Sequence, residues 1–391
     1  MRNIILYIGS IFLPDRSAGA QRALSLSKSF RDLGYRMVIV GMAAEQSRSI
    51  PIQETRNYCN GFETFSVSQP QNIGEWFHHS TSIKEFTDVI SYYGVSRIFA
   101  IVAMEYEAIP LIRLSVYCRK NGIHLIADAE EWYEKSTMTF PMNIAKNIDT
   151  TLRMRYVYPR LITNMICISR FFEEHFSSVV PHCVYVPGTI DPEERKWEEL
   201  DRYFPNDIFT IGYAGSPGLH FEKERLDLLI SAVLELNEEG QNCLLKIAGV
   251  DKDFIKERLP DLCLTNAISF LGKVSHKQCL NIIATSDFSA IIREDKRVTK
   301  AGFPTKLSES FGCGTPVLTT DSSNIFDYVV DGVTGIRCYG YTKESIKQGI
   351  LRAINISKEQ LILMHSSIRI NNPLVYSNFT DTIAHLLHLL D

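Results

Sequence analysis

The sequence lacks the features that mark membrane-spanning, secreted and zinc-binding proteins. No apolar run reaches the roughly 20 residues that a helix needs to cross a bilayer. The apolar start at residues 1–9 is too short for a secretory signal and is soon followed by Pro14, Asp15 and Arg16. The nine cysteines include no Cys-x-x-Cys pair and do not cluster with histidine, which predicts reduced thiols rather than a disulfide framework or a zinc site. We therefore expect a cytoplasmic protein, and we leave open peripheral contact with the inner face of the membrane.

Charge and composition exclude two further classes of function. The net charge of −4 argues against a nucleic-acid-binding surface, so no nucleic acid is expected as a partner. No Asp-x-Asp pair stands at a convincing strand end, which predicts a site without a metal. A chain of 391 residues, 45% hydrophobic and 22% charged, is typical of a globular protein with two or three domains.

The clearest motif lies in residues 288–320, which predict a strand, a glycine-bearing loop, a helix and a second strand. The run Phe288–Ile292 is apolar and β-prone, the helix is expected after Pro304 and before Gly314, and residues 316–319 predict the next strand. In such βαβ units, ligands bind outside the carboxyl ends of the strands, where loops meet helix N-termini. The sequence therefore predicts a binding site in the loop and first turn of this helix.

The loop at residues 302–304 and the turn after it have the chemistry of a phosphate site. Gly302 has no Cβ and lets the backbone approach a ligand closely, while the first amides of the helix, at Thr305 and Lys306, suit a phosphate. Lys306 and Glu309 share a helix face, so one can meet phosphate charge while the other accepts hydrogen bonds from sugar hydroxyls. The alternative is a surface loop with an exposed lysine and glutamate.

Residues 300–317 resemble the donor-binding signature of group 1 (family 4) retaining glycosyltransferases, which have the GT-B fold. Such enzymes usually show a glutamate, seven residues and a second glutamate, followed by Gly-x-Pro-Val. Here Glu309 stands at the second glutamate and residues 314–317 match the turn. The first glutamate falls at Ala301, a departure that concerns the family's contact to the donor sugar and leaves the phosphate- and nucleoside-binding parts unchanged. The loop Ala301–Lys306 is similar to that of a bacterial subset of the family.

The amino-terminal half opens with a β-loop-α-β pattern. Residues 3–8 and 37–40 predict strands, and a helix is expected over about 19–33. The segment Gly19-Ala-Gln-Arg22 resembles the family's Gly-Gly-x-Glu-Arg loop, which implies that Gly19 faces a substrate. The alternative is a glycine that only eases close packing.

Four carboxylates follow a predicted strand within seven residues. The stretch runs from Asp128 through Glu130 and Glu131 to Glu134, after the predicted strand Ile123–Ala127. Carboxylates packed together raise each other's pKa, which suits proton transfer or orientation of sugar hydroxyls. The resemblance places a sugar-facing residue here, although the family's usual histidine is absent, and Asp128 and Glu131 are the catalytic candidates. The alternative is an acidic, solvated loop with one aromatic anchor.

A second glycine loop opens the carboxyl-terminal half. Residues 209–213 predict a strand, residues 214–218 a loop and residues 224–238 a helix. In the family such a loop faces the diphosphate with the help of an arginine and a lysine. By that resemblance, Ser216 takes the place of the arginine, Lys223 is the candidate lysine, and Arg293 could supply the missing charge. Glycine loops also occur without ligands, and residues 293–300 could be a solvated charge run.

Other elements are expected at Val95–Ala103 (a buried strand), Ile166–Arg170 (a strand) and residues 193–205 (a charged linker), while residues 43–80 are not assigned beyond loops and short elements. The resemblance implies an α/β protein with two Rossmann-like domains facing each other across a cleft. The expected divisions are an acceptor-side domain at 1–195, a nucleotide-sugar donor domain at 206–373, and a last helix at 374–391 that returns to the first domain.

The implied function is transfer of a sugar, with retention, from a UDP- or GDP-linked donor to a sugar, lipid-linked or protein acceptor in polysaccharide or glycoconjugate synthesis. No cofactor is expected, since the nucleotide-sugar is a substrate. The alternatives are an inverting transferase or epimerase of the same fold, and a non-catalytic partner or scaffold. The predicted substrate-binding residues are Gly19, Gly215, Ser216, Lys223, Arg293, Gly302, Phe303, Pro304, Thr305, Lys306 and Glu309.

Overall fold

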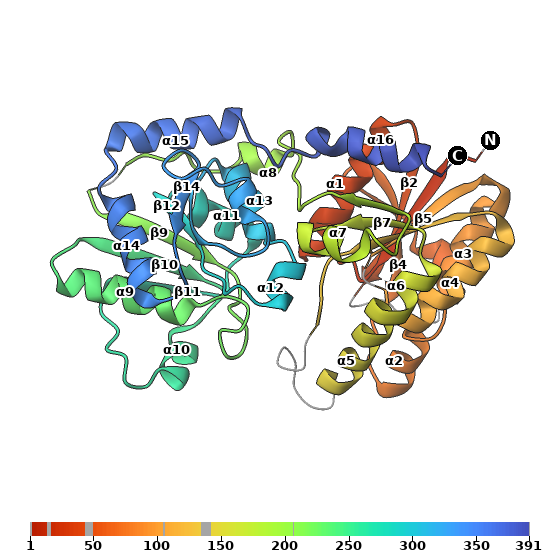
Figure 1. Cartoon of the computed structure of the whole chain (residues 1–391), viewed down its shortest axis with the longest axis horizontal. Helices are drawn as coiled ribbons and strands as arrows, with labels where there is room; N and C mark the ends of the chain where they lie inside the picture. The colour runs from red at the N-terminus through yellow and green to blue at the C-terminus, as the bar shows by residue number, and fades with distance from the viewer. Residues whose placement is uncertain are drawn as a thin grey trace. The chain divides into compact units, whose positions relative to one another are not determined.

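The chain forms two compact units, shown in the computed structural model of Figure 1. The first unit comprises Met1–Thr189 and Tyr376–Asp391, and the second comprises Ile190–Val375. The structure describes residues 2–13, 17–43, 50–104, 106–133, 142–205 and 207–390, with nothing described of the Met142 side chain. Predictions that involve residues 14–16, Glu134 and residue 206 lie outside these ranges.

The first unit is built on an eight-stranded sheet in the order β3-β4-β2-β1-β5-β6-β7-β8. Neighbouring strands pair in parallel except for the edge strand β3, which is antiparallel to β4. Every residue of the central strands β1 and β5 is buried, as expected where helices cover both faces of a parallel sheet. The strands are β1 (Ile4–Gly9), β2 (Arg36–Ala43), β3 (Asn57–Cys59), β4 (Phe62–Ser68), β5 (Ile98–Met104), β6 (His124–Ala129), β7 (Asn164–Cys167) and β8 (His182–Tyr185).

The helices of this unit include the last one in the chain. That helix, α16, packs on α1 and on β8 and buries Ile383, Leu386 and Leu387 in the same core as α1. Within the described ranges, none of the helices in either unit combines the length and apolar character needed to cross a bilayer. The helical segments are α1 (Ala18–Asp32), η1 (Ile52–Thr55), α2 (Ile73–His79), α3 (Lys84–Tyr93), η2 (Val95–Arg97), α4 (Ala108–Asn121), α5 (Met142–Leu152), η4 (Arg153–Val157), α6 (Tyr158–Leu161), α7 (Arg170–Phe176), η6 (Tyr376–Phe379) and α16 (Thr380–His388).

The second unit holds a six-stranded, wholly parallel sheet in the order β11-β10-β9-β12-β13-β14. The strands are β9 (Phe209–Ala214), β10 (Cys243–Ala248), β11 (Ile268–Gly272), β12 (Phe288–Ile291), β13 (Val317–Thr320) and β14 (Gly335–Cys338). The helices are α8 (Arg195–Glu198), α9 (Leu226–Glu238), α10 (Lys252–Arg258), α11 (His276–Ala284), α12 (Arg297–Ala301), α13 (Thr305–Cys313), η5 (Ile325–Asp327), α14 (Lys343–Ile354) and α15 (Lys358–Ile370). Two α/β units, one with a largely parallel and one with a wholly parallel sheet, confirm the predicted fold class.

Local sequence signals explain the helix that carries the predicted site. The strand β12 lies in the middle of the sheet, between β9 and β13, so the loop that follows it emerges at the carboxyl edge. Helix α13 begins after Pro304 and ends at Gly314, whose φ of 74° is the left-handed conformation that glycine adopts easily. The predicted strand-loop-helix-strand unit is therefore present.

Several predicted elements differ in detail. Residues Val95–Arg97 form the turn η2 after Gly94, whose φ is 88°, so the strand β5 begins only at Ile98. The strand expected at Ile166–Arg170 ends at Cys167, because Ser169 caps the helix α7 by accepting a hydrogen bond from the Phe172 amide. The unassigned residues 43–80 contain β3, β4, η1 and α2, and the expected linker contains the short helix α8.

Candidate functional site

The side chain of Lys306 lies in a largely buried niche at the start of α13. Its ammonium group forms an ion pair with Glu224 and sits 3.9 Å from the centroid of the Tyr213 ring. The two charged side chains are 20% and 8% exposed. Gly215, at a φ of 129°, makes room for the lysine, since a Cβ at that position would lie 2.8 Å from Lys306 Cε. The predicted loop at residues 214–218 and the predicted helix are thus brought together through this lysine.

Burial and the Glu224 carboxylate shift the pKa of Lys306 in opposite directions. Burial lowers the pKa of Lys306, the Glu224 carboxylate opposes that shift, and the charge of Arg293 adds to it. Burial also raises the pKa of the Tyr213 hydroxyl, with the Glu224 carboxylate raising it further. An ammonium that is partly stripped of water interacts strongly with a nearby anion. The niche is therefore suited to an anionic group.

Glu309 lies one turn further along α13 and borders the same small cavity. Its Oε1 is 3.0 Å from His276 Nε2. A cavity of about 10 Å³ is lined by Lys306, Glu309 and Ser310 together with Ala214 and Ser289, and the hydroxyls of Ser289 and Ser310 are 2.7 Å apart. The predicted pair of Lys306 and Glu309 therefore shares one surface.

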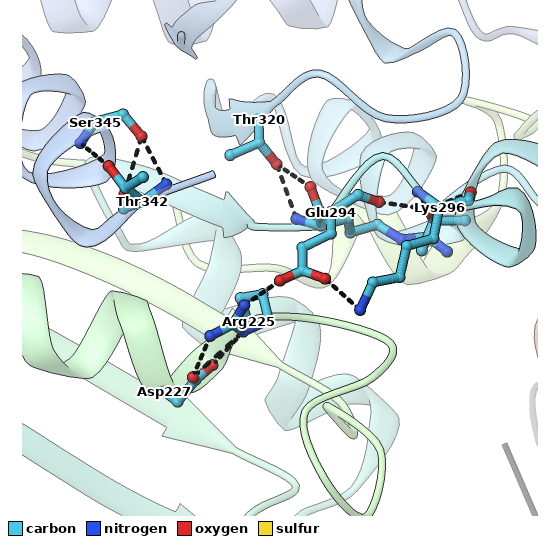
Figure 2. A network of polar contacts seen from close by, with 9 residues as sticks. Arg225, Asp227, Glu294, Lys296, Thr320, Thr342 and Ser345 are labelled. Atoms are coloured by element: carbon cyan, nitrogen blue, oxygen red, sulfur yellow. Dashed lines mark hydrogen bonds and ion pairs between the residues drawn. The ribbon is translucent and has the colours of Figure 1, made fainter. Parts of the chain in front are cut away.

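A polar network fixes the loop after β12, as Figure 2 shows. The Arg293 amide donates to Thr320 Oγ1 at 2.8 Å, and that hydroxyl donates back to the Arg293 carbonyl at 2.6 Å. Arg225 binds the Asp227 carboxylate at 2.7 Å and also pairs with Glu294, which in turn pairs with Lys296. Glu294 is thus tied to the start of α9, whereas the charged side chains of residues 295–297 in the same run are exposed.

Three further predictions in this unit concern Lys223, Ser216 and the first turn of α13. Lys223 is exposed, and the structure does not bring it to Lys306, because the next residue, Glu224, points there instead. Ser216 Oγ accepts a 3.4 Å hydrogen bond from the Gly218 amide within its own loop. The first turn of α13, at Pro304 and Thr305, has no side-chain cap, which leaves that end of the helix for other acceptors.

The loop before α13 is less open than expected. Phe303 is 5% exposed and packs edge-on against Tyr328, with ring centroids 5.7 Å apart. Gly302 has a φ of −85°, an extended conformation that any residue adopts. Ala301 is fully buried. The backbone here therefore does not itself require glycine at 302.

In the first unit, Asp128 is part of a sealed polar cluster. Its carboxylate is 0% exposed and accepts hydrogen bonds from Arg22 Nη2 at 2.6 Å and from the Tyr7 hydroxyl. Arg22 is 2% exposed and also donates to the carbonyls of Val186 and Pro187 at 3.0 and 2.9 Å. These partners occupy both carboxylate oxygens, so the geometry favours a structural role for Asp128 over the predicted proton transfer.

The other two predicted residues of the first unit, Glu131 and Gly19, have surroundings unlike those of Asp128. The Glu131 side chain is exposed at the end of the sheet, three residues after Asp128. Gly19 lies in the first turn of α1, where a Cβ would come 2.9 Å from Met104 Cε. Gly19 therefore lies against the flexible end of the Met104 side chain. The structure does not bring either residue into contact with the sealed cluster's carboxylate.

Sequence reasoning missed Glu224 and Tyr213, which form the walls of the Lys306 niche, and His276 beside Glu309. Glu224 comes from 82 residues away in the chain. The one available signal was Gly215, because a residue without a Cβ leaves space for a long side chain from elsewhere.

Comparison with known proteins gives a family match that lies within the second unit. A family model described as Glycosyl transferases group 1 matches residues 214–364, which contain both Lys306 and Glu309. An uncharacterised glycosyltransferase of Methanocaldococcus jannaschii is 26% identical over 141 residues, which are 35% of this chain and 34% of that protein. The alignment thus spans about a third of the relative's length.

Solved structures are similar over the whole chain. Sucrose-phosphate synthase from Thermosynechococcus elongatus aligns with a TM-score of 0.71 at 11% identity, covering 100% of this chain and 99% of that one. Anabaena HepE in complex with UDP and glucose gives 0.65 at 14%, covering 99% and 100%. The catalytic domain of starch synthase IV from Arabidopsis thaliana, bound to ADP and acarbose, gives 0.71 at 10%, covering 100% and 99%. At these identities the likeness shows the GT-B fold, and the family match supports a group 1 glycosyltransferase.

Proposed function

We propose that the protein is a glycosyltransferase that moves a sugar from a nucleotide-sugar donor to a hydroxyl acceptor. The observation that carries the proposal is the Lys306 niche at the uncapped start of α13. It lies inside the segment that the group 1 family model matches. Similar structures carry UDP and ADP, which supports a nucleoside diphosphate as the ligand.

The proposed reaction requires the site to stabilise the leaving diphosphate as negative charge builds on it. Preorganised cations and helix amides aimed at that charge are among the largest contributions to catalysis. In the free protein Lys306 is paired with Glu224, so a phosphate must compete for the same ammonium group. Arg293 adds positive charge nearby. Glu309, beside His276, is proposed to hold the ribose hydroxyls.

Several finer properties belong to the same proposal. The donor is a UDP- or GDP-linked sugar, the configuration is retained, and the acceptor is a sugar, lipid-linked or protein hydroxyl in polysaccharide or glycoconjugate synthesis. The reaction is proposed to proceed without a metal, because Lys306, Arg293 and the α13 amides supply the positive charge. Of the two acidic candidates, the exposure of Glu131 supports a role at the reacting sugar.

Nucleotide-sugar turnover is the test of the proposal. The full chain is incubated with UDP- and GDP-sugars and simple hydroxyl acceptors, and release of the nucleoside diphosphate is followed together with the anomeric configuration of the product. Release that depends on the acceptor, with a retained configuration, supports the proposal. Loss of most activity in EDTA, restored by magnesium or manganese, contradicts metal independence.

A second candidate is a non-catalytic partner that kept the fold and the nucleotide site. It is favoured by Ala301, fully buried where the family has its first glutamate, and by the sealed position of Asp128. The same assay separates the two, because this candidate predicts nucleotide binding with no turnover for any donor.

A further inference from the structure

Glu309, the residue proposed to meet the ribose, is held from a second helix by His276. His276 Nε2 lies 3.0 Å from Glu309 Oε1, and the two side chains are 32% and 24% exposed. His276 is the first residue of α11, whereas Glu309 lies on α13, 33 residues further along the chain. An ionised carboxylate can only accept hydrogen bonds, so the imidazole Nε2–H is the donor in this contact. The contact therefore fixes one oxygen of Glu309 and leaves the other for different donors.

The backbone that carries His276 is fixed by a helix cap. The Ser275 hydroxyl accepts a hydrogen bond from the Gln278 amide at 3.3 Å, and Gln278 Oε1 accepts one from the Ser275 amide at 2.9 Å. This reciprocal capping box defines how the chain enters the helix. Because His276 directly follows the cap residue, its position at the start of α11 is defined as well.

The helices α11 and α13 are also tied to each other and lie side by side in Figure 1. Thr315 Oγ1 donates to the Ile283 carbonyl at 3.0 Å, and Cys313 Sγ lies 3.6 Å from the Leu280 carbonyl. Leu280, Ile283 and Cys313 are buried in one apolar cluster. Packing therefore sets the separation of the two helices independently of the ion pair.

The second oxygen of Glu309, Oε2, has no hydrogen-bond partner among the described residues. Glu309 borders the cavity that Lys306 also lines, where the diphosphate is proposed to bind. A carboxylate oxygen at that place can accept hydrogen bonds from the ribose hydroxyls of the same nucleotide. A long side chain loses rotamer freedom when a ligand fixes it, and a side chain already held in the free protein loses less.

A neighbouring ion pair shows what a purely structural contact on this helix looks like. Lys277, the next residue of α11, lies 2.9 Å from Glu199, and these side chains are 60% and 48% exposed. Such exposed pairs contribute little to stability. The pair of His276 and Glu309 differs because it borders the Lys306 cavity. Lys277 is therefore a matched control for His276.

We propose that His276 is a positioning residue that directs the Glu309 carboxylate at the ribose hydroxyls and so makes the site selective for ribonucleotides. The inference rests on the proposed function, and it adds which sugar the nucleotide itself must carry. A site built to hydrogen-bond a hydroxyl discriminates strongly against the analogue that lacks it, because the polar group of the site is then left unpaired.

The test is calorimetric titration of the full chain with UDP and GDP and with the 2′,3′-dideoxy analogue of each. Wild type is expected to bind the ribonucleotide about 10- to 150-fold more tightly than its analogue, the range for a hydrogen bond to a charged group. His276→Ala is expected to weaken ribonucleotide binding about 2- to 12-fold, the cost of fixing one long side chain. The same variant should leave the affinity for the dideoxy analogue unchanged, and Lys277→Ala should leave both affinities unchanged.

A double-mutant cycle tests whether His276 acts through Glu309. In a Glu309→Ala background, His276→Ala is expected to change ribonucleotide affinity by less than about twofold, because the carboxylate that it positions is absent. His276→Gln keeps an N–H donor on a side chain of similar reach. This variant is expected to bind ribonucleotides within about twofold of wild type.

The outcomes separate this inference from the proposed function. A wild type that binds neither UDP nor GDP overturns both. If wild type binds, the positioning role alone is overturned by His276→Ala binding the ribonucleotide as tightly as wild type, by an equal loss for the dideoxy analogue, or by His276→Gln binding as weakly as His276→Ala. Melting temperatures check folding, and His276→Asn, whose amide is too short to reach Glu309, takes the place of an alanine variant that unfolds.

Discussion

Each unit holds an ion pair at the carboxyl edge of its sheet, and the two pairs differ in exposure, which separates scaffold from site. Arg22 and Asp128 are 2% and 0% exposed, and Arg22 also pairs with the largely buried Glu130 at 3.2 Å. Lys306 and Glu224 are 20% and 8% exposed, lie against a glycine loop, and stand at the uncapped start of a helix. A sealed pair has no room for a ligand, whereas a partly open one can exchange an internal anion for an external one.

The largest effect on stability is expected at the sealed pair. Asp128→Asn removes the nearer of the two carboxylates that pair with the buried Arg22 guanidinium and leaves Glu130, 3.2 Å from Arg22 Nε. We expect a cost of about 3 kcal/mol of folding free energy, the lower end of the range for breaking a buried ion pair. Denaturant unfolding measures this loss. Activity should fall only as far as the folded fraction falls. A variant that is stable yet loses about 10²–10⁴-fold in turnover would restore Asp128 as a proton-transfer group.

A substitution of Lys306 in the open pair is expected to lower activity instead. Lys306→Ala removes a charge-assisted hydrogen bond to phosphate, which lowers turnover by about 1.5–3 kcal/mol, or about 10- to 150-fold. Steady-state kinetics on the folded variant measure the loss, and Lys252→Ala on the exposed surface of α10 is the matched control. A change below about threefold would remove the phosphate role from Lys306.

Replacing the internal anion should shift stability and ligand affinity in opposite directions. Glu224→Gln leaves the Lys306 ammonium without its carboxylate, which costs about 1–3 kcal/mol in the free protein. The same change removes the competitor of the phosphate, so UDP or GDP should bind more tightly. Calorimetric titration checks the affinity. Weaker nucleotide binding would mean that Glu224 takes part in holding the ligand.

A smaller effect is expected from a sealed titratable group in the second unit. Burial lowers the pKa of His365 to about 3, and its ring stacks on Tyr203 at 3.7 Å. The folded protein keeps this histidine neutral, while the unfolded chain takes up a proton below about pH 6.5. The resulting stability is therefore full above pH 6.5 and is lost as the pH falls toward 3, by about 2 kcal/mol at pH 5. Unfolding curves of His365→Gln should show a shallower loss than wild type, whereas the exposed control His220→Gln should not.

The sequence predicted the open site better than the closed one for a physical reason. Helical spacing and turn chemistry are local, so the strand β12, the helix α13 and the shared face of Lys306 and Glu309 follow from adjacent residues. Which distant charge pairs with which is not local. Glu224 reaches Lys306 across 82 residues and Arg22 reaches Asp128 across 106, and neither pairing leaves a periodic trace in the sequence.

The same limit explains the acidic stretch after β6. Four neighbouring carboxylates are typical of either a catalytic cluster or a solvated loop, yet Asp128 pairs with Arg22 inside the unit while Glu131 faces outward. Alternation along an extended chain sends successive side chains to opposite sides. Helix α1 supplies the cation, Arg22, on one of these sides. Because α1 lies far from this stretch in the sequence, the local pattern cannot show which side that is.

We propose that Lys306 and the start of α13 hold the diphosphate of the donor, and nucleotide-induced thermal stabilisation measures this binding. With UDP or GDP at about 100 times its dissociation constant, wild type should gain about 2.7 kcal/mol of stability, seen as a higher melting temperature. Lys306→Ala should lose most of that gain at the same ligand concentration, and Lys252→Ala should keep it. If Lys306→Ala is stabilised as much as wild type, Lys306 does not hold the diphosphate.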